Sequence, residues 1–173
     1  MGDGEPTTHL SCARWGGHQD VLKAMESSDP ISAVLQHKSS ELWTASPGTT
    51  VYEAIKMMAE KDIGALLVMK GDKLVGLISE REYTRDVILK EKSSQGTLVE
   101  DIMIAKLVTV EPSDTVQHCM ELMTNRRFRY LPVVSNGDLV GLVSIGDLVK
   151  WVISAQDALI GQLESYIKGS YPG

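Results

Sequence analysis

Gly141-Leu142-Val143-Ser144-Ile145-Gly146-Asp147 is the most informative stretch of this sequence. Its apolar first half follows the turn signal Asn136-Gly137 and is too short to form a helix, so it is interpreted as a buried strand. Ser144 is a favoured N-cap residue, and Asp147 comes three residues later, in the first turn of the helix that would follow. The stretch therefore predicts a strand that runs directly into a helix. Open α/β sheets tend to bind ligands at such junctions.

A related stretch, Gly76-Leu77-Ile78-Ser79-Glu80-Arg81-Glu82, lies 65 residues upstream. The same offset holds without a gap from Thr44, which pairs with Thr109, to residues 87–88, which pair with 152–153. A long match at one fixed offset indicates an internal duplication. We therefore predict two consecutive copies of one structural unit.

Both copies show the same order of elements: a short leading helix (residues 30–37 and 97–103), a brief extended piece, a helix, two strands joined by a tight turn, and a last helix. The fold class is α/β (α+β). We assign residues 1–28 to a flexible N-terminal tail, 29–91 to the first repeat, 97–155 to the second, and 156–173 to a C-terminal helical extension.

Capping and periodicity give more local expectations. Asp29 is predicted to cap the first leading helix, with Pro30 at its first position. The helix after Ser79 should turn Val87 and Ile88 inward, and Gly161 is a possible weak point in the last helix. That helix carries an apolar stripe beyond the second repeat, which favours a dimer contact; its members are Leu159, Leu163, Tyr166 and Ile167.

Composition excludes several classes of protein. The net charge of −6 argues against a general nucleic-acid binder, because counterion release requires a basic face. No apolar run approaches the roughly 20 residues that cross a bilayer. Cys12 and Cys119 form no disulfide framework, and Cys119 is expected to be a small core residue. Residues 1–28 do not resemble a transit peptide, which indicates a cytoplasmic protein.

The corner formed by Ser144 and Asp147 suits a nucleoside phosphate. An ionised carboxylate accepts both hydroxyls of a ribose, and a helix N-terminus attracts phosphate. Gly146 would let a ligand approach the backbone. The alternative interpretation is a capping box, since both have the pattern S-x-x-D/E. We favour ligand binding for this corner, and the capping box for Ser79 and Glu82, because Glu is the reciprocal capping residue.

A basic cluster distinguishes the second copy from the first. It directly precedes a strand, and we expect it to lie beside the Ser144–Asp147 corner and to hold phosphate. The alternative is a solvated basic turn, which is as good an interpretation for Arg126 alone. The asymmetry suggests one working site, or two sites of unequal affinity. The cluster consists of Arg126, Arg127 and Arg129, and the strand begins at Tyr130. At the positions of Arg126, Arg127, Arg129 and Tyr130 the first copy has Lys61, Asp62, Gly64 and Ala65.

No catalytic set is recognisable, and no group of histidines and cysteines has metal-ligand spacing, so we predict a protein that is not an enzyme. The paired G-h-h-S-x-x-D/E motifs resemble the tandem CBS-domain pair, or Bateman module. Val99-Glu100-Asp101-Ile102-Met103 and Arg127-Phe128-Arg129-Tyr130-Leu131-Pro132-Val133 carry the same resemblance. The chain is similar to the plant stand-alone proteins with a single CBS pair. Three stretches resemble their mitochondrial type in particular: Leu42-Trp43, Thr50-Val51-Tyr52-Glu53-Ala54 and Leu163-Glu164-Ser165-Tyr166-Ile167-Lys168-Gly169.

This resemblance implies β-α-β-β-α units about a pseudo-twofold axis, homodimers, and clefts that bind AMP, ADP, ATP or S-adenosylmethionine. Ser144 and Asp147 would then hold the ribose, with Ser79 and Glu82 as their counterparts in the other cleft. Thr44 and Thr109 would border the adenine, and Arg129 and Tyr130 match positions that often face phosphates. The sequence departs from the family pattern at Glu82, where Asp is usual, and at Tyr130, where His is frequent.

The resemblance also implies a regulator of thioredoxin systems and of redox homeostasis, and a mitochondrial location as the alternative to a cytoplasmic one. We therefore expect a non-catalytic regulatory module that binds an adenosine ligand and modulates a partner protein. The alternative is a nucleotide-independent protein-interaction module whose cleft is empty or filled by side chains.

Overall fold

The computed structural model describes residues 28–38 and 41–169. The tail expected at residues 1–28, apart from residue 28, and the end of the C-terminal extension at 170–173 lie outside the described residues. The first half comprises α2 (Ile31–Gln36), β1 (Thr44–Ala45), α3 (Val51–Lys61), β2 (Ala65–Lys70), β3 (Lys73–Ser79), α4 (Glu80–Tyr83) and a π-helical turn (Thr84–Ile88). The second comprises a 3₁₀ turn (Val99–Asp101), α5 (Val116–Arg126), β4 (Tyr130–Ser135), β5 (Asp138–Ser144) and α6 (Ile145–Gly169).

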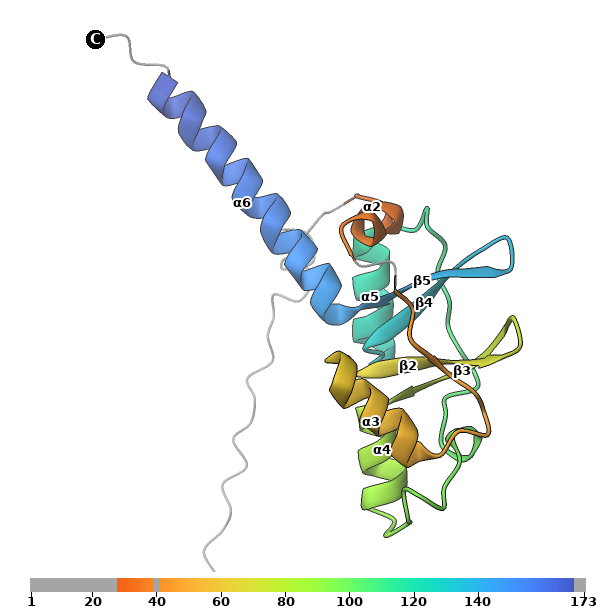
Figure 1. Cartoon of the computed structure of the whole chain (residues 1–173). Helices are drawn as coiled ribbons and strands as arrows, with labels where there is room; N and C mark the ends of the chain where they lie inside the picture. Colours follow the sequence, from red (N-terminus) through yellow and green to blue (C-terminus); the bar gives the residue numbers. More distant parts are fainter. Residues whose placement is uncertain (1–27, 39–40, 170–173) are drawn as a thin grey trace, which may run out of the picture.

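The duplication is visible in the strand pairing. β2 and β3 form an antiparallel hairpin, with β1 parallel to β2, and β4 and β5 form the matching hairpin. Ala45 pairs with Val68, and 65 residues later Val110 forms a parallel bridge to Val133. Each hairpin has its irregularity at the same place, directly after Val68 or Val133. The expected α+β repeat is therefore confirmed. In Figure 1 the two hairpins lie one above the other, with α3 and α4 at one end and α5 at the other.

Local sequence explains why the repeated helices begin and end together. The hydroxyl oxygens of Thr50 and Thr115 accept hydrogen bonds from backbone N–H groups in the first turns of α3 and α5. Asp62 and Arg127 end these helices in the left-handed region, with φ of 53° and 57°. β2, which follows α3, and β4, which follows α5, therefore begin at equivalent positions in the two copies.

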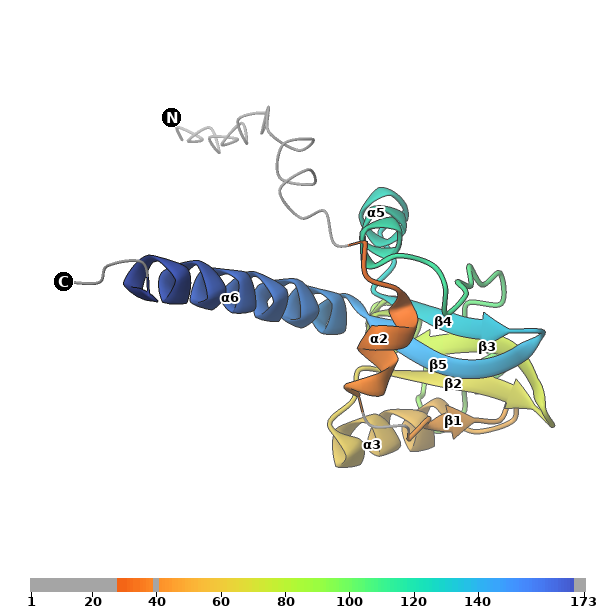
Figure 2. The same ribbon diagram turned by 90° about the horizontal axis from the view of Figure 1, so that it is seen from above.

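Each leading segment packs on the other repeat. Ile31 and Val34 of α2 are buried in the core of the second half, with residues of α5, β4, β5 and α6. Val99 and Ile102 are buried in the core of the first half. A third buried cluster, which includes Leu67 and Leu77, joins the two hairpins. Figure 2 shows α2 lying across the hairpins, and in Figure 1 α2 and α3 lie on opposite sides of the two hairpins.

Two glycines make this packing possible. A Cβ atom at Gly141 of β5 would lie 2.7 Å from a methyl carbon of Leu35 in α2. A Cβ atom at Gly76 of β3 would lie 2.5 Å from the sulfur of Met103, beside the 3₁₀ turn. The absence of side chains at these equivalent positions lets each leading segment lie close against a strand.

Three local expectations are wrong. Asp29 does not cap α2; its carboxylate accepts a hydrogen bond from the Trp151 indole at 2.9 Å, and Pro30 is the N-cap residue without a side-chain bond. The leading helix at residues 97–103 is only a 3₁₀ turn, because Ile104 already pairs with Leu77. Ile88 is 53% exposed although Val87 is buried, since consecutive residues of a helical turn point in different directions. The inward position of Val87 and the buried position of Cys119 are confirmed.

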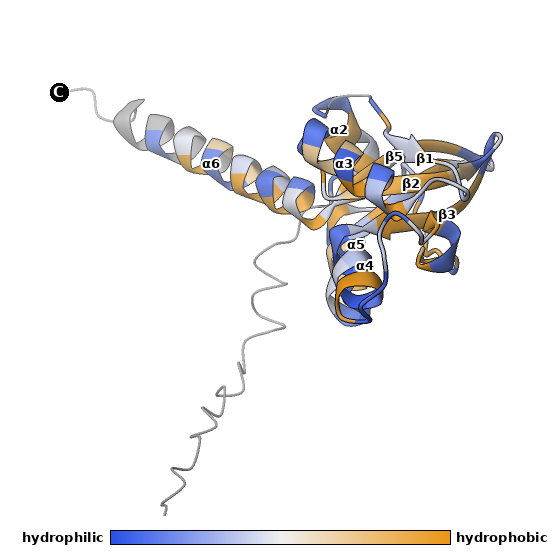
Figure 3. Cartoon of the chain, turned by 60° about the horizontal axis from the view of Figure 1, so that its bottom comes forward, coloured by the Kyte–Doolittle hydropathy of each residue, from blue (hydrophilic) through white to orange (hydrophobic). Residues whose placement is uncertain are grey.

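α6 continues without interruption through Gly161, the proposed weak point, and projects beyond the body of the molecule (Figure 1). Its 25 residues span about 37 Å. The side chains of the predicted stripe, Leu159, Leu163, Tyr166 and Ile167, lie outside the described residues. Other hydrophobic residues recur along α6 (Figure 3), including the exposed Ile145, Val149, Ile153 and Ile160. The described residues contain no helix with the length and apolar content that a bilayer crossing requires.

The contact between Leu35 and Gly141 gives a stability prediction. Gly141→Val should lower the free energy of unfolding by about 1–3 kcal/mol, because the new side chain overlaps Leu35. Leu35→Ala in the same chain should recover part of this loss, and denaturant unfolding measures both. Gly48→Ala is the control, because no atom lies within 4 Å of a Cβ placed there. Additive effects of the Leu35 and Gly141 substitutions would contradict the crossed packing of α2.

Candidate functional site

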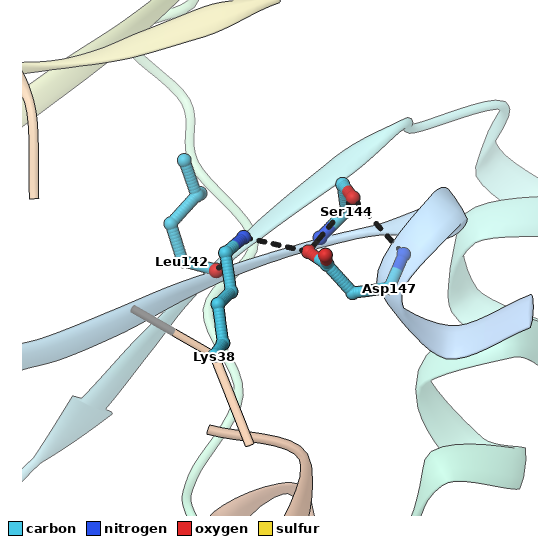
Figure 4. Close-up of polar contacts among 4 residues, drawn as sticks. All are labelled: Lys38, Leu142, Ser144 and Asp147. Atoms are coloured by element: carbon cyan, nitrogen blue, oxygen red, sulfur yellow. Dashed lines mark hydrogen bonds and ion pairs between the residues drawn. The ribbon is translucent and has the colours of Figure 1, made fainter. Parts of the chain in front are cut away.

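The Ser144–Asp147 corner lies where β5 meets α6 (Figure 4). The Ser144 N–H and hydroxyl both donate to Oδ2 of Asp147, each at 2.8 Å. The Asp147 N–H donates to Oγ of Ser144 at 3.2 Å. These bonds form a complete capping box, which is the alternative interpretation of the S-x-x-D pattern. The box does not exclude ligand binding, because Ser144 and Asp147 also line a cavity.

Lys38 is the third member of this corner, and it lies two residues after the end of α2. Its Nζ donates to Oδ2 of Asp147 at 2.7 Å and to the carbonyl oxygen of Leu142 at 3.2 Å (Figure 4). The Lys38 side chain is 36% exposed and that of Asp147 is 22% exposed. The carboxylate that would receive a ribose is thus already paired with an ammonium group.

The ionisation of Asp147 follows from these contacts. Burial is the largest single influence, and it raises the pKa of the carboxyl group. The hydrogen bonds from Lys38 and Ser144 and the charge of Lys38 together outweigh it, and the pKa of Asp147 lies below its ordinary value of 3.8. Asp147 is therefore a carboxylate at neutral pH and can accept hydrogen bonds from a diol.

Beside this corner lies a cleft of about 370 Å³, which we call cleft A. The volume falls within the range of small-molecule sites. Its walls come from both repeats and are largely apolar, with Trp43 and Tyr130 as aromatic members. The lining residues are Leu35, Lys38, Glu41, Leu42, Trp43, Asp62, Ile63, Gly64, Ala65, Leu67, Tyr130, Val140, Gly141, Leu142, Ser144 and Asp147.

The pseudo-symmetric counterpart, cleft B, holds only about 40 Å³. The Ser79 hydroxyl donates to the Glu82 carboxylate, and Nη1 of Arg81 donates to the Arg127 carbonyl oxygen at 2.9 Å. Ser79 is also the side chain that caps α4. Cleft B is lined by Leu77, Ser79, Arg81, Glu82, Ile104, Arg127, Phe128, Arg129 and Tyr130.

Larger side chains explain why cleft B is small. Equivalent positions carry Ala65 in cleft A and Tyr130 in cleft B, at the starts of β2 and β4. Gly64 in cleft A corresponds to Arg129 in cleft B. Arg81, which lines cleft B, replaces the glycine found at position 146. The backbone is duplicated, but the side chains fill one cleft and leave the other open.

The expected association of the basic cluster with the Ser144–Asp147 corner is wrong. Arg127 and Arg129 line cleft B with Ser79 and Glu82, because each strand start faces the corner of the opposite repeat. Tyr130 alone lines both clefts.

The remaining candidates lie at the margins of the clefts. Thr44 and Thr109 are exposed and are absent from the described walls of both clefts. Gly146 is exposed in the first turn of α6, where a Cβ atom would meet only Oγ of Ser144, at 3.6 Å.

Sequence reasoning missed Lys38, Glu41, Trp43 and Asp62 as cleft residues. Lys38 is 109 positions from Asp147 and lies before the gap-free part of the duplication, so no spacing connects the two. For Asp62 a signal existed, because the duplication matches it to Arg127, which was itself a candidate.

Within residues 28–38 and 41–169 there is no group of His, Cys, Asp and Glu side chains arranged to hold a metal ion. Burial and the neighbouring Asp114 raise the pKa of the Cys119 thiol to about 12. The buried Cys119 therefore lacks the thiolate character of a nucleophile.

Comparisons with known proteins agree with this architecture. The CBS domain family model matches residues 31–88 and 99–154. "CBS domain-containing protein CBSX3, mitochondrial" from Arabidopsis thaliana is 40% identical over 83% of this chain and 74% of its own length. An inosine-5'-monophosphate dehydrogenase from Korarchaeum cryptofilum is 41% identical over 83% of this chain, but the match spans only 30% of that enzyme.

A solved structure of a protein with CBS domains from Burkholderia ambifaria MC40-6 superposes with a TM-score of 0.72 and 50% identity. The match covers 74% of this chain and 96% of that one. This chain therefore belongs to the CBS-domain family, and its two domains form a tandem pair.

Proposed function

We propose that this protein is a non-catalytic regulatory module that binds an adenosine-containing ligand in cleft A and modulates a partner protein. CBS-pair proteins are regulatory modules and often bind nucleotides. The observation that carries the proposal is the contrast between cleft A, at about 370 Å³, and cleft B, at about 40 Å³. One of two symmetric sites has kept the room that a nucleoside needs.

Cleft A offers groups suited to each part of a nucleoside. Leu42, Trp43 and Leu142 provide apolar and aromatic surface for a planar base. Asp147, held as a carboxylate, accepts the ribose hydroxyls once Lys38 releases Oδ2. AMP, ADP, ATP and S-adenosylmethionine share this adenosine part.

Regulation follows from the composition of the cleft walls. Trp43 and Ala65 come from the first repeat, whereas Leu142 and Asp147 come from the second. A ligand that contacts both repeats stabilises the arrangement in which they close on it, and so shifts the population of conformations that a partner meets. A thioredoxin is our candidate partner, which would make the protein a regulator of redox homeostasis. The similarity to the mitochondrial Arabidopsis relative favours a mitochondrial location over the cytoplasmic one.

A nucleotide-independent interaction module is the second candidate function. Cleft B favours it, because its side chains leave space for little more than one or two water molecules. In that case the fold would serve as a rigid binding surface, and Lys38 would remain on Asp147.

Homodimerisation is the remaining part of the proposal. Ile145, Val149 and Ile153 are 40%, 38% and 53% exposed, and they follow one another at intervals of four residues on α6. Ile160, 54% exposed, continues the same face seven residues later. An apolar stripe of this length is typical of a helix that pairs with another helix. We propose that α6 of a second copy covers this stripe, because in a twofold-symmetric dimer the partner helix presents the same apolar stripe.

The ligand proposal predicts a difference between two equivalent carboxylates. Asp147→Ala should weaken the binding of AMP or S-adenosylmethionine by roughly tenfold or more, because hydrogen bonds to a charged group are lost. Glu82→Ala, the matched control in cleft B, should change the affinity less than about twofold, since too little space exists there for a ligand. Isothermal titration calorimetry measures both.

Since the Asp147 carboxylate also accepts the Ser144 N–H in the capping box of α6, Asp147→Asn, which keeps the shape of the side chain, is measured in parallel. Equal affinity of wild type and both Asp147 variants would refute cleft A as the site. If no adenosine ligand binds and a thioredoxin is still captured without nucleotide, the interaction module is the correct function.

The dimer proposal predicts that Ile153→Glu converts the protein to a monomer, because a charge would be buried in the helix pair. Ala158→Glu is the control, since this exposed residue lies on the opposite side of α6. Sedimentation equilibrium reports the mass in each case. A helix pair of this kind should have a dissociation constant of about 0.1 μM or less, so the protein should be dimeric at about 50 μM. A wild type that is monomeric at that concentration would contradict the assignment.

A further inference from the structure

A groove between α2 and α6 adjoins cleft A. It encloses about 640 Å³ and is open to solvent. Lys38 and Asp147 line both cavities, so the groove begins where the cleft ends. The lining residues of the groove are Val34, His37, Lys38, Asp147, Lys150, Trp151, Ser154 and Ala155.

The charges of the two cavities differ in sign. Apart from the shared pair, the charged residues that line cleft A are the acidic Glu41 and Asp62. The groove instead adds Lys150 and the imidazole of His37. The Lys38–Asp147 ion pair therefore separates an acidic chamber from a basic one. A ligand that spans both would be oriented by its own charge distribution.

The groove wall is well supported. The Trp151 indole donates to the Asp29 carboxylate at 2.9 Å, and its ring packs edge-to-face against His37 with centroids 5.2 Å apart. Nδ1 of His37 lies 3.0 Å from the Ala33 carbonyl oxygen. These contacts link α2 to α6 and hold the two basic sides of the groove in place.

We propose that the groove is the phosphate subsite of a nucleotide whose nucleoside part occupies cleft A; the proposal rests on the function proposed above. A ribose on Asp147 would sit at the junction, with its base in the cleft and its phosphate in the groove. The phosphate then replaces the Asp147 carboxylate as the partner of Lys38, and the ribose hydroxyls replace Lys38 as the partners of Asp147. Lys150 and the Ser154 hydroxyl complete the anion site.

This exchange of partners names the ligand class. A nucleoside phosphate satisfies every group that binding disturbs, because Lys38 gains an anion as it leaves Asp147. A neutral nucleoside would displace the Lys38 ammonium without giving it a new counter-charge. S-adenosylmethionine has a carboxylate, but its sulfonium and ammonium groups would bring a net positive charge into the basic groove. The ligand is therefore an adenosine mono- or diphosphate in preference to S-adenosylmethionine.

Calorimetry with adenosine, AMP, ADP and S-adenosylmethionine on the full chain tests the subsite. AMP should bind roughly tenfold or more tightly than adenosine, because it adds charge-assisted hydrogen bonds. Lys150→Met should weaken AMP and ADP by about tenfold and leave adenosine within about twofold. Lys56→Met is the matched control: Lys56 is exposed on α3, pairs with Glu60, and is absent from the described walls of both cavities.

Lys38→Met gives a second readout, because it removes the competitor of the ribose as well as a partner of the phosphate. Adenosine should bind this variant more tightly than wild type, while the preference for AMP over adenosine should fall. Equal affinity for AMP and adenosine, equal effects of Lys150→Met on both, or tighter binding of S-adenosylmethionine would overturn the subsite and leave cleft A intact. Failure of all four ligands to bind would overturn the proposed function itself.

Discussion

Each half of the molecule is completed by a segment that precedes the other half. Ile31 and Val34 fill the core of the second repeat, and Val99 and Ile102 fill that of the first. Because both segments cross over, the two hairpins are held against each other and share the buried cluster between them. This arrangement creates the clefts, since each cleft lies between the strand start of one repeat and the strand–helix corner of the other. Lys38 reaches Asp147 for the same reason, as α2 packs on the second repeat.

The duplication has constrained the backbone more strongly than the cleft side chains. Left-handed residues, bulges and strand registers recur 65 residues apart, because each is required for the same turn or pairing. Ala65 and Tyr130 occupy equivalent places, yet one leaves a cavity and the other helps to fill one. A surface cleft tolerates such changes because its side chains do not support the core. The two repeats thus form one open cleft and one nearly filled cleft.

Much of this architecture could be predicted from the sequence. The apolar strand before Ser144, the cap at Ser144 and the repeat itself are local or periodic signals, and the structure confirms them. Asp147 was also recognisable, because its spacing from Ser144 is a local pattern. The pairing of Asp147 with Lys38, and the separation of Arg129 from Asp147, depend on which repeat faces which corner. That information resides in the crossed packing, which no spacing within one repeat encodes.

The crossed packing also suggests how such a chain could originate. A lone unit would expose the apolar floor that its neighbour's leading segment covers, so a single-copy ancestor would need two molecules to make one fold. Joining the copies through the short linker at residues 92–96 turns an encounter in solution into an internal one. For a short flexible linker the effective concentration is on the order of millimolar, far above that of most free proteins. Doubling the gene would thus have removed the dependence on protein level, and it let the two halves change independently for the first time.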